Sequence, residues 1–431
     1  MYLRFIRSNN IANMSFYTIC FLLMIAIIGS SSSVTNTAIA SFDTNIPSII
    51  DQNIRANTIT SWNELTSQLG IKENLSPPQF SRVYALVHIS IYDSLLAAAA
   101  AAAAATAANR EYNTVAFDNK SFYVSSITEA VSTVLAYLFP KHTNEIVKLK
   151  STQISQFQDY DDNLSIKRGG MLGYQVSQAV IDYAEKDNSD LVWNNTNNNT
   201  NETIPRQSSN NNCTWNGSNP VNPMAGFWKT YILKSGSEVQ PGKPLACGSE
   251  ADLLDLRQTY EVSKNRTSGQ VAAIQYWGNK PPPVIWNNIL NQQIQKYNMS
   301  IFDAAYSGVY LNVGMYDGFV SCWYTKYNYW TARPFQRIAN LTTEIPTPNF
   351  PGYTSGHSVI SVVASRVLGE IFSNQRDYFN DKAEEAALSR LWAGIHFKQD
   401  IINGMSQGDK IAKKVVEDMH KGIHPFIYNN L

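Results

Sequence analysis

The segment PGYTSGHSVISVVASRVLGEIF, residues 351–372, runs from a proline-glycine turn into an amphipathic helical pattern. Ser355 and Gly356 stand at the predicted helix start, where free backbone N–H groups and the positive end of the helix dipole attract oxyanions. Gly356 lets the backbone approach a ligand closely, and His357 adds a side chain that can exchange a proton near neutral pH. The segment predicts an oxyanion site; a capping serine beside an incidental histidine is the alternative.

A second stretch, KYNYWTARP at residues 326–334, supplies two cations. Lys326 and Arg333 are seven residues apart, which on a straight helix is two turns, so both side chains would leave one face. Both could then reach a single anion. Pro334 places Arg333 near the end of that helix. Taken alone, an ordinary solvated helix with two cations is the alternative.

A third stretch, RLWAGIHFKQD at residues 390–400, adds an arginine, a histidine and an aspartate. On one continuous helix Arg390 and His396 would lie about 120° apart. They converge only if the helix breaks between them, and Gly394 is a residue that permits the break. Asp400 follows His396 by four residues, the spacing at which a carboxylate can hold one imidazole nitrogen and aim the other. A surface patch of these residues is the alternative.

The other histidines and the cysteines are weaker candidates. His88 lies on the apolar side of a predicted helix and is expected to be a hydrogen-bonded core residue, while the remaining histidines stand in polar or terminal contexts. Cys213 and Cys247 lie in one polar, loop-like region and form the expected disulfide pair if the protein is exported. Cys322 is expected to be a buried thiol. No spacing of cysteine and histidine suggests zinc.

The fold class follows from the apolar periodicity. Stripes at three- and four-residue spacing predict helices over residues 81–108, 125–139, 169–184, 286–297, 301–330, 358–372, 381–393 and 401–421. Strand-like alternation is scarce, so we expect an all-α protein in two bundle-like halves, the second carrying the chemistry. The expected organisation is a signal peptide at 1–40, an N-terminal helical half at 41–193, an Asn-rich surface insert at 194–250, and a C-terminal half with the site at 251–431.

Composition excludes several classes of protein. A chain of 431 residues with 44% hydrophobic content can build a substantial core, which excludes disorder throughout. Lysine and arginine number 34, aspartate and glutamate also 34, and no basic run reaches five residues, so no nucleic-acid partner is expected. Anion binding must therefore be local. The sequence leaves the oligomeric state open, a homo-oligomer included.

The amino terminus has the pattern of an export signal. Arg4 and Arg7 precede an apolar run at residues 16–29 and the A-x-A pattern at residues 38–40. A retained membrane anchor is the alternative, although a run of about 14 apolar residues is short for a span. No other segment is expected to cross a membrane, so the mature protein is expected to be secreted or extracytoplasmic. Glycan acceptor sequons occur at Asn74, Asn119, Asn194, Asn198, Asn201, Asn212, Asn216, Asn265, Asn298 and Asn340.

The three stretches together resemble the signature of the superfamily that joins vanadium-dependent haloperoxidases and type 2 phosphatidic acid phosphatases: K-x6-R-P, P-S-G-H and S-R-x5-H-x3-D. The first and third are complete here, the third beginning at Ser389, and the second has Thr354 where the family usually has proline. PPQFSRVYALVHISIYDSLLA and MYDGFVSCWYTKY are similar to segments of the longer, haloperoxidase-type members. Trp323 and Phe350 are similar to a tryptophan and a phenylalanine of the chloroperoxidase-like members.

This resemblance implies a cofactor, vanadate, and a role for each site residue. Lys326, Arg333 and Arg390, with Ser355 and the Gly356 backbone, would hold the vanadate oxygens. His396 would be the axial ligand on the metal, oriented by Asp400, and His357 would act as acid and base. The implied substrates are hydrogen peroxide, polarised by Lys326, and a halide, which is oxidised to hypohalous acid or a halogenated product.

Two other functions stay open on the sequence. In a phosphatase the same pocket would take a phosphomonoester, His396 would attack phosphorus, and His357 would protonate the leaving alcohol. A non-catalytic exported surface protein is the third hypothesis, and it is the weakest because no residue of the predicted pocket is missing.

Overall fold

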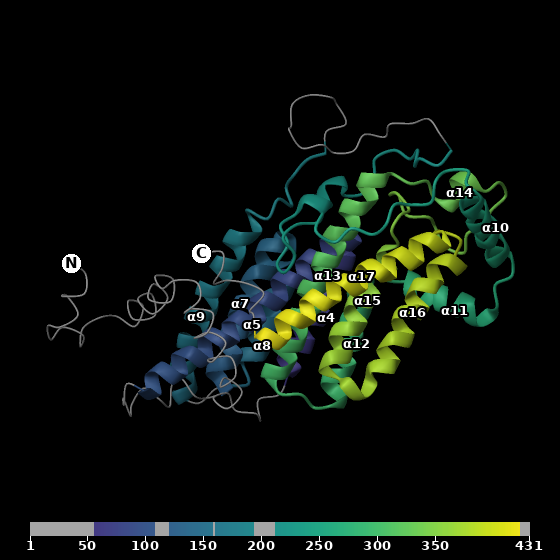
Figure 1. The fold of residues 1–431 in the computed structure, drawn as a ribbon. Helices are drawn as coiled ribbons and strands as arrows, with labels where there is room; N and C mark the ends of the chain where they lie inside the picture. Colours follow the sequence, from purple (N-terminus) through teal and green to yellow (C-terminus); the bar gives the residue numbers. More distant parts are fainter. Residues whose placement is uncertain (1–55, 108–119, 158–159, 194–211, 423–431) are drawn as a thin grey trace.

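The computed structural model describes residues 56–107, 120–157, 160–193 and 212–422 (Figure 1). Within these ranges the regular structure is helical, and the only β-type contact is an isolated antiparallel bridge between Thr214 and Thr331. The prediction of an all-α protein is confirmed. The predicted signal peptide at residues 1–40 lies outside the described residues.

The helices fall into two sequence groups. The first contains α4 (Asn57–Lys72), α5 (Pro77–Ala107), α7 (Lys120–Leu138), η3 (Pro140–His142), α8 (Thr143–Ile154) and α9 (Tyr160–Ala184). After a short 3-10 turn, η4 (Pro223–Phe227), the second contains α10 (Glu250–Lys264), α11 (Ser268–Gly278), α12 (Pro282–Lys296), α13 (Ile301–Tyr329), α14 (Pro334–Arg337), α15 (Gly356–Ile371), η5 (Ser373–Gln375), α16 (Arg376–Trp392) and α17 (Lys398–Lys421).

Every helix predicted from apolar periodicity is present, but α4, α8, α10, α11 and the single-turn α14 were not predicted. Helix α10 shows why the pattern failed. Its adjacent leucines, Leu253 and Leu254, are both about half exposed, so no apolar stripe marks an inward face. The helix is fixed instead by its Ser249 cap, whose side chain accepts from the backbone N–H of Asp252.

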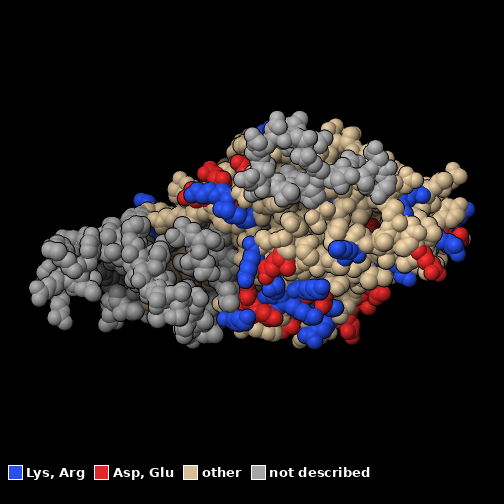
Figure 2. Space-filling view, turned by 45° about the horizontal axis from the view of Figure 1, so that its top comes forward, with Lys and Arg blue, Asp and Glu red and all other residues tan. Residues whose placement is uncertain are grey.

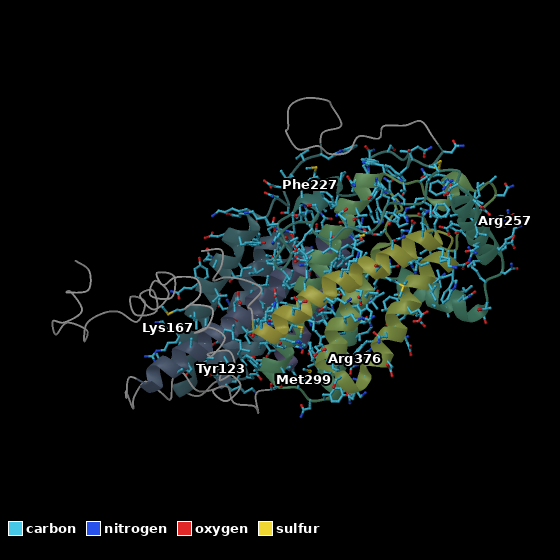
Figure 3. All side chains as sticks on the ribbon, viewed as in Figure 1. Tyr123, Lys167, Phe227, Arg257, Met299 and Arg376 are labelled. Carbon is cyan, nitrogen blue, oxygen red and sulfur yellow. A yellow bond between two sulfur atoms is a disulfide. The ribbon has the colours of Figure 1, made fainter. Side chains whose placement is uncertain are left out.

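Helix α13 lies at the centre of the molecule, packed against α5 on one side and α15 on the other (Figure 1). Its glycines allow this close approach: a Cβ at Gly308 would lie 2.2 Å from Nδ1 of His88, and one at Gly318 would lie 2.9 Å from the Ile360 side chain. One buried apolar cluster therefore runs from Ala56 to Met419. Figure 3 shows side chains filling the space between these helices.

His88 is fully buried beside α13, which confirms its predicted place in the core. Among the described residues, no hydrogen bond of ordinary geometry reaches either ring nitrogen, although the Asn287 side chain lies close enough to interact with the ring. Burial lowers the pKa of His88 to about 3, so the ring is neutral at physiological pH.

The described part of the Asn-rich insert, residues 212–249, is not wholly superficial. Trp215, Trp228 and Leu233 are buried, and the Asp317 carboxylate on α13 accepts three successive backbone N–H groups from residues 231–233 at 2.8 to 2.9 Å. These contacts bind the segment to the central helix without regular secondary structure. A polar composition did not predict them because only scattered apolar residues face inward.

The predicted disulfide between Cys213 and Cys247 is present, and Cys322 is a buried free thiol as expected. The bridge closes a loop with a sequence separation of 34 residues. Backbone N–H groups of Trp215 and Ala332 bond across to the carbonyls of Trp330 and Cys213, so this loop contacts the turn that follows α13.

Reduction of this disulfide is expected to lower the free energy of unfolding by about 3 to 4 kcal/mol, the loop-closure entropy for this separation. Denaturant unfolding with and without a reductant would measure the change. A Cys213→Ser/Cys247→Ser variant should match the reduced protein, and equal stability of oxidised and reduced protein would contradict the expectation.

Helix α5 is apolar and long enough, over Pro77–Ala103, to cross a membrane by length and composition. The sequence analysis predicted no such segment beyond the amino terminus. However, 89% of the most apolar window of α5 is buried inside the protein, as in the core helix of a globular protein. On the face drawn in Figure 2, Lys and Arg lie interspersed with Asp and Glu, without a patch of a single sign.

Candidate active site

In the stretch at residues 326–334, Lys326 and Arg333 come together across a helix end, not along one helix face. Helix α13 ends at Tyr329, and Trp330 follows in the left-handed conformation with φ 50°. Arg333 lies after the next turn and directly before α14, whose first residue is Pro334. The expectation that Lys326 and Arg333 share one straight helix is therefore wrong, although both are fully buried in the same region.

Lys326 projects from the last turn of α13 beneath the turn that precedes α15. Its Nζ donates to the backbone carbonyls of Pro351, Gly352 and Thr354 at 3.1, 2.8 and 2.5 Å. The ammonium also lies 5.1 Å from the ring centroid of Phe350. A lysine with three carbonyl acceptors fixes the shape of this turn and adds a buried positive charge behind it.

Arg333 connects the same turn to the third stretch. Its Nε donates to the Phe350 carbonyl at 2.8 Å, and Nη1 donates to the Ile395 carbonyl at 2.8 Å and to Nε2 of His396 at 2.9 Å. The second terminal nitrogen, Nη2, is buried and makes no hydrogen bond to a described residue. A buried guanidinium N–H without an acceptor is costly, so this nitrogen points to an anionic guest.

The Ser-Gly pair begins α15 as the sequence predicted. Ser355 is its N-cap and accepts from the backbone N–H of Ser358, and Gly356 is the first helical residue. A Cβ on Gly356 would meet only ordinary contacts with Trp323 and Phe319, at 3.6 and 3.8 Å. Thr354, where the related motif has proline, bonds through its hydroxyl to Gln407 instead of capping the helix.

The break predicted between Arg390 and His396 is present. Helix α16 ends at Trp392, Gly394 has φ 74°, and α17 begins at Lys398. The positive φ is readily available to glycine and strained for other residues, so Gly394 sets the turn. It brings His396 back toward Arg390, and both line one cavity.

His396 has a defined tautomer. Its Nδ1 lies 2.9 Å from Oδ2 of Asp400, while Nε2 lies 2.9 Å from Nη1 of Arg333. A guanidinium can only donate, so Nε2 carries the lone pair and Nδ1–H donates to the carboxylate. Burial, then the charge of Arg333, holds the pKa of His396 well below its usual range, so the imidazole is neutral. This is the form that a metal ligand or a nucleophile requires.

The cavity in front of His396 has a volume of about 400 Å³ and also exposes Gly356, His357 and Arg390. Arg390 donates from Nε to Ser389 and from Nη2 to the Ile274 carbonyl. Lys326, Arg333 and Ser355 do not line this cavity and stand behind the residues that do. Two of the three stretches thus line one cavity, and the third contacts them from behind through Arg333, which bonds to the Ile395 carbonyl and to His396.

His357 is held by a residue that sequence reasoning missed. Its Nε2 lies 2.9 Å from the backbone carbonyl of Trp277, which can only accept, so Nε2 carries the proton and Nδ1 is the acceptor. Burial and then Arg390 keep the pKa of His357 well below its usual range. His357 is thus neutral near pH 7, and it is a base rather than an acid until an anion binds.

Asp255 is a second residue that the sequence did not reveal. From α10, its carboxylate accepts the backbone N–H groups of Lys398 and Gln399 at 3.0 and 3.1 Å. Phe397, the residue before α17, has no polar side chain to cap the helix, so Asp255 supplies the cap. Asp400 lies one residue further along the same turn. No local pattern predicts a cap that comes from 143 residues upstream.

Oxyanion binding is expected to weaken as the pH rises. Burial lowers the pKa of Lys326 and raises the pKa of Asp400, which interacts with it. On raising the pH, Lys326 loses its positive charge early and Asp400 gains its negative charge late, and both changes oppose an anion. Calorimetric titration with sulfate, whose charge is constant between about pH 6 and 9, should give weaker binding at the higher pH. Equal affinity at both ends would contradict this expectation.

Comparisons with known proteins bear on the fold of the chain. Residues 372–425 match the VCPO second helical-bundle domain. A bacterial vanadium-dependent iodoperoxidase structure is similar with a TM-score of 0.67 at 22% identity, covering 85% of this chain and 97% of that one. A bacterial vanadium-dependent chloroperoxidase is similar in its holo form (TM-score 0.63, 13% identity, 81% and 93% covered) and its apo form (0.63, 14%, 81% and 95%). No curated protein sequence matches the chain.

The C-terminal match contains α17, the helix that positions Asp400, and the structural matches extend over most of both chains. Sequence identities between 13% and 22% show a similarity of fold alone. The resemblance inferred from the three sequence stretches is therefore confirmed: this chain has the fold of the vanadium haloperoxidase family.

Proposed function

We propose that the protein is a vanadium-dependent haloperoxidase, which oxidises halide with hydrogen peroxide at a vanadate held by His396. The observation that carries the proposal is the state of His396: neutral, with its Nδ1–H bound to Asp400 and the lone pair of Nε2 turned toward the Arg333 guanidinium. An imidazole of this tautomer beside buried cations is suited to an anionic metal-oxo group.

The residues present fit vanadate by their chemistry. Arg333, Arg390 and Lys326 supply positive charge, and the buried Nη2 of Arg333 is a donor without an acceptor among the described residues. The Gly356 backbone at the start of α15 adds the positive end of a helix dipole. Cationic and backbone N–H donors of this kind would hold and neutralise the oxygens of a bound oxyanion.

Bound vanadate supplies a Lewis-acidic centre that activates hydrogen peroxide toward attack by halide. The residues around it hold charge and move protons. His396 offers Nε2 as the ligand, Asp400 fixes its ring, and the three cations neutralise the oxyanion. His357, neutral and fixed at Nε2 by Trp277, accepts a proton from the incoming peroxide at Nδ1.

The test is a paired assay on the purified protein. Vanadate-loaded protein is given hydrogen peroxide, bromide and a halogen acceptor, and vanadate-free protein is given a generic phosphomonoester. Halogenation that rises with vanadate occupancy, without phosphate release, supports the proposal. Phosphate release with no halogenation at any vanadate level removes it and assigns the site to a phosphatase that uses His396 as nucleophile.

We also propose that the protein is exported and glycosylated. Of the sequon asparagines named above, six lie in the described residues, and all six are exposed: Asn74, Asn212, Asn216, Asn265, Asn298 and Asn340. The disulfide is the kind of bond that persists in an oxidising compartment. Mass spectrometry of the protein secreted by its own cells would test both statements, through the mature amino terminus and the glycan masses.

A further inference from the structure

The cavity in front of His396 is much larger than the proposed inorganic substrates need. Its volume is about 400 Å³, whereas one water molecule in the liquid occupies about 30 Å³. Hydrogen peroxide and a halide ion are each only slightly larger than water. The volume lies instead within the range of roughly 300 to 1,000 Å³ that is typical of pockets for organic ligands.

The walls of this cavity are apolar and stiff. Trp277, Phe319, Trp323 and Phe350 contribute aromatic rings, and the Trp323 and Phe350 rings pack with centroids 4.9 Å apart. Further wall residues are prolines, which have little freedom to rearrange: Pro77, Pro281, Pro282, Pro346 and Pro348. Such a preformed aromatic slot favours a flat, apolar guest, because offset and edge-on ring contacts add to the gain from burial.

One cation in the lining has no hydrogen-bond or ion-pair partner in the part of the chain that the structure describes. Lys280 lies in the turn between α11 and α12 and lines the cavity. It is only partly exposed, and it makes no hydrogen bond or ion pair to any described residue. The other cation of the lining, Arg390, already donates to Ser389 and to the Ile274 carbonyl. An apolar slot with one unpaired ammonium at its wall is complementary to an aromatic ring that bears one acidic group.

We propose that this cavity binds an aromatic carboxylate or phenolate as the organic substrate, with its ring between the aromatic walls and its anionic oxygen at Lys280. The binding step depends only on the cavity and not on the proposed function. The reaction of the bound substrate rests on the proposed function. A substrate held beside His396 is halogenated inside the cavity, and not by hypohalous acid that has diffused into solution.

The chemistry balances as follows. One aromatic C–H bond breaks and one carbon–halogen bond forms. The halide is oxidised by two electrons, and hydrogen peroxide is reduced, with the proton released from the ring and one further proton, to two molecules of water. Because the ring is held in one orientation, one position should be halogenated in preference to the others.

Calorimetric titration of the vanadate-free protein tests the binding step without any activity. The probe is 2-naphthoate, compared with 2-naphthylmethanol, which has the ring without the charge, and with acetate, which has the charge without the ring. We expect 2-naphthoate to bind about tenfold or more tightly than either comparator. We also expect sulfate not to compete, because the donors proposed for an oxyanion are Arg333, Arg390 and the Gly356 backbone, and not Lys280.

Variants separate the charge at Lys280 from the folding of the chain. Lys280→Met should weaken 2-naphthoate about tenfold and leave 2-naphthylmethanol and sulfate binding unchanged, whereas Lys280→Arg should retain affinity. Lys410→Met, at an exposed position on α17, is the matched control. Competition between sulfate and 2-naphthoate, equal binding in wild type and Lys280→Met, or no binding of 2-naphthoate would each overturn the proposal.

The halogenation assay then distinguishes the two proposals from each other. If 2-naphthoate binds through Lys280 but no halogenation occurs with vanadate, the substrate pocket stands and the proposed function fails. If halogenation occurs with the same product distribution in wild type and Lys280→Met, the haloperoxidase activity stands and the substrate pocket fails.

Discussion

Replacing His396 with alanine is expected to lower the vanadate-dependent halogenation rate by about 10³-fold or more, equivalent to roughly 4 kcal/mol of transition-state stabilisation. The variant removes an imidazole that lines the cavity and whose two ring nitrogens are fixed by Asp400 and Arg333. Lys326, Arg333 and Arg390 remain, so the charge that attracts an oxyanion is largely retained.

Binding measurements reveal why activity is lost in the His396→Ala variant. Vanadate can accept a nitrogen ligand at the metal, whereas sulfate cannot, so vanadate affinity should fall by about 10- to 100-fold or more and sulfate affinity should change much less. Calorimetry with both ions measures this difference. If both affinities fell equally, the histidine would act through the shape or charge of the site and not as a ligand.

His420→Ala is the matched control for this substitution. His420 is exposed near the end of α17 and pairs with Glu370 on the surface, away from the cavity lining. Its removal should leave halogenation, vanadate binding and sulfate binding unchanged. Halogenation by His396→Ala within about tenfold of wild type would contradict the proposed role.

The candidate site could be predicted from sequence where local chemistry determines geometry. Ser355 and Gly356 mark a helix start by their own capping and backbone properties, and Gly394 breaks the chain between Arg390 and His396 because it accepts a positive φ. The four-residue spacing of His396 and Asp400 likewise allows the hydrogen bond between their side chains. In each case the cause lies within a few residues of its effect.

Prediction failed where distant contacts set the geometry. Trp330 adopts a left-handed conformation that tryptophan does not favour, and its carbonyl is held by the backbone of Trp215 from the insert. Helix α13 ends just before Trp330, so Arg333 does not share a helix face with Lys326 as the periodicity predicted. Asp255 on α10 caps α17, and no pattern in the sequence around either segment indicates this contact.

Lys326→Met is expected to have the second large effect: a loss of oxyanion affinity of about 10²-fold near pH 6, where the lysine is charged. The substitution replaces a fully buried cation with a neutral side chain of similar length. Lys326 stands behind the cavity, so the loss is one of charge: two unit charges about 4 Å apart attract by about 4 kcal/mol at an effective dielectric constant of about 20, and by less at a greater distance. Sulfate titration measures the loss. Lys410→Met again serves as the exposed control and should bind sulfate as wild type does.

The stability of Lys326→Met is expected to change less than its affinity. Three carbonyls, those of Pro351, Gly352 and Thr354, lose their donor, but the protein no longer buries a charge whose pKa is already lowered by desolvation. These effects oppose each other, so the free energy of unfolding should fall by only about 1 to 3 kcal/mol.

The pH dependence of Lys326→Met separates charge from shape. In wild type, sulfate binding should weaken with rising pH, because Lys326 loses its proton while Asp400 loses its own. In the variant only Asp400 remains to titrate, and the neighbouring cation no longer favours its ionised form, so the dependence should be shallower and displaced to higher pH. A wild-type slope in the variant would mean that another group controls anion binding, and Lys326 would then act only by holding the turn before α15.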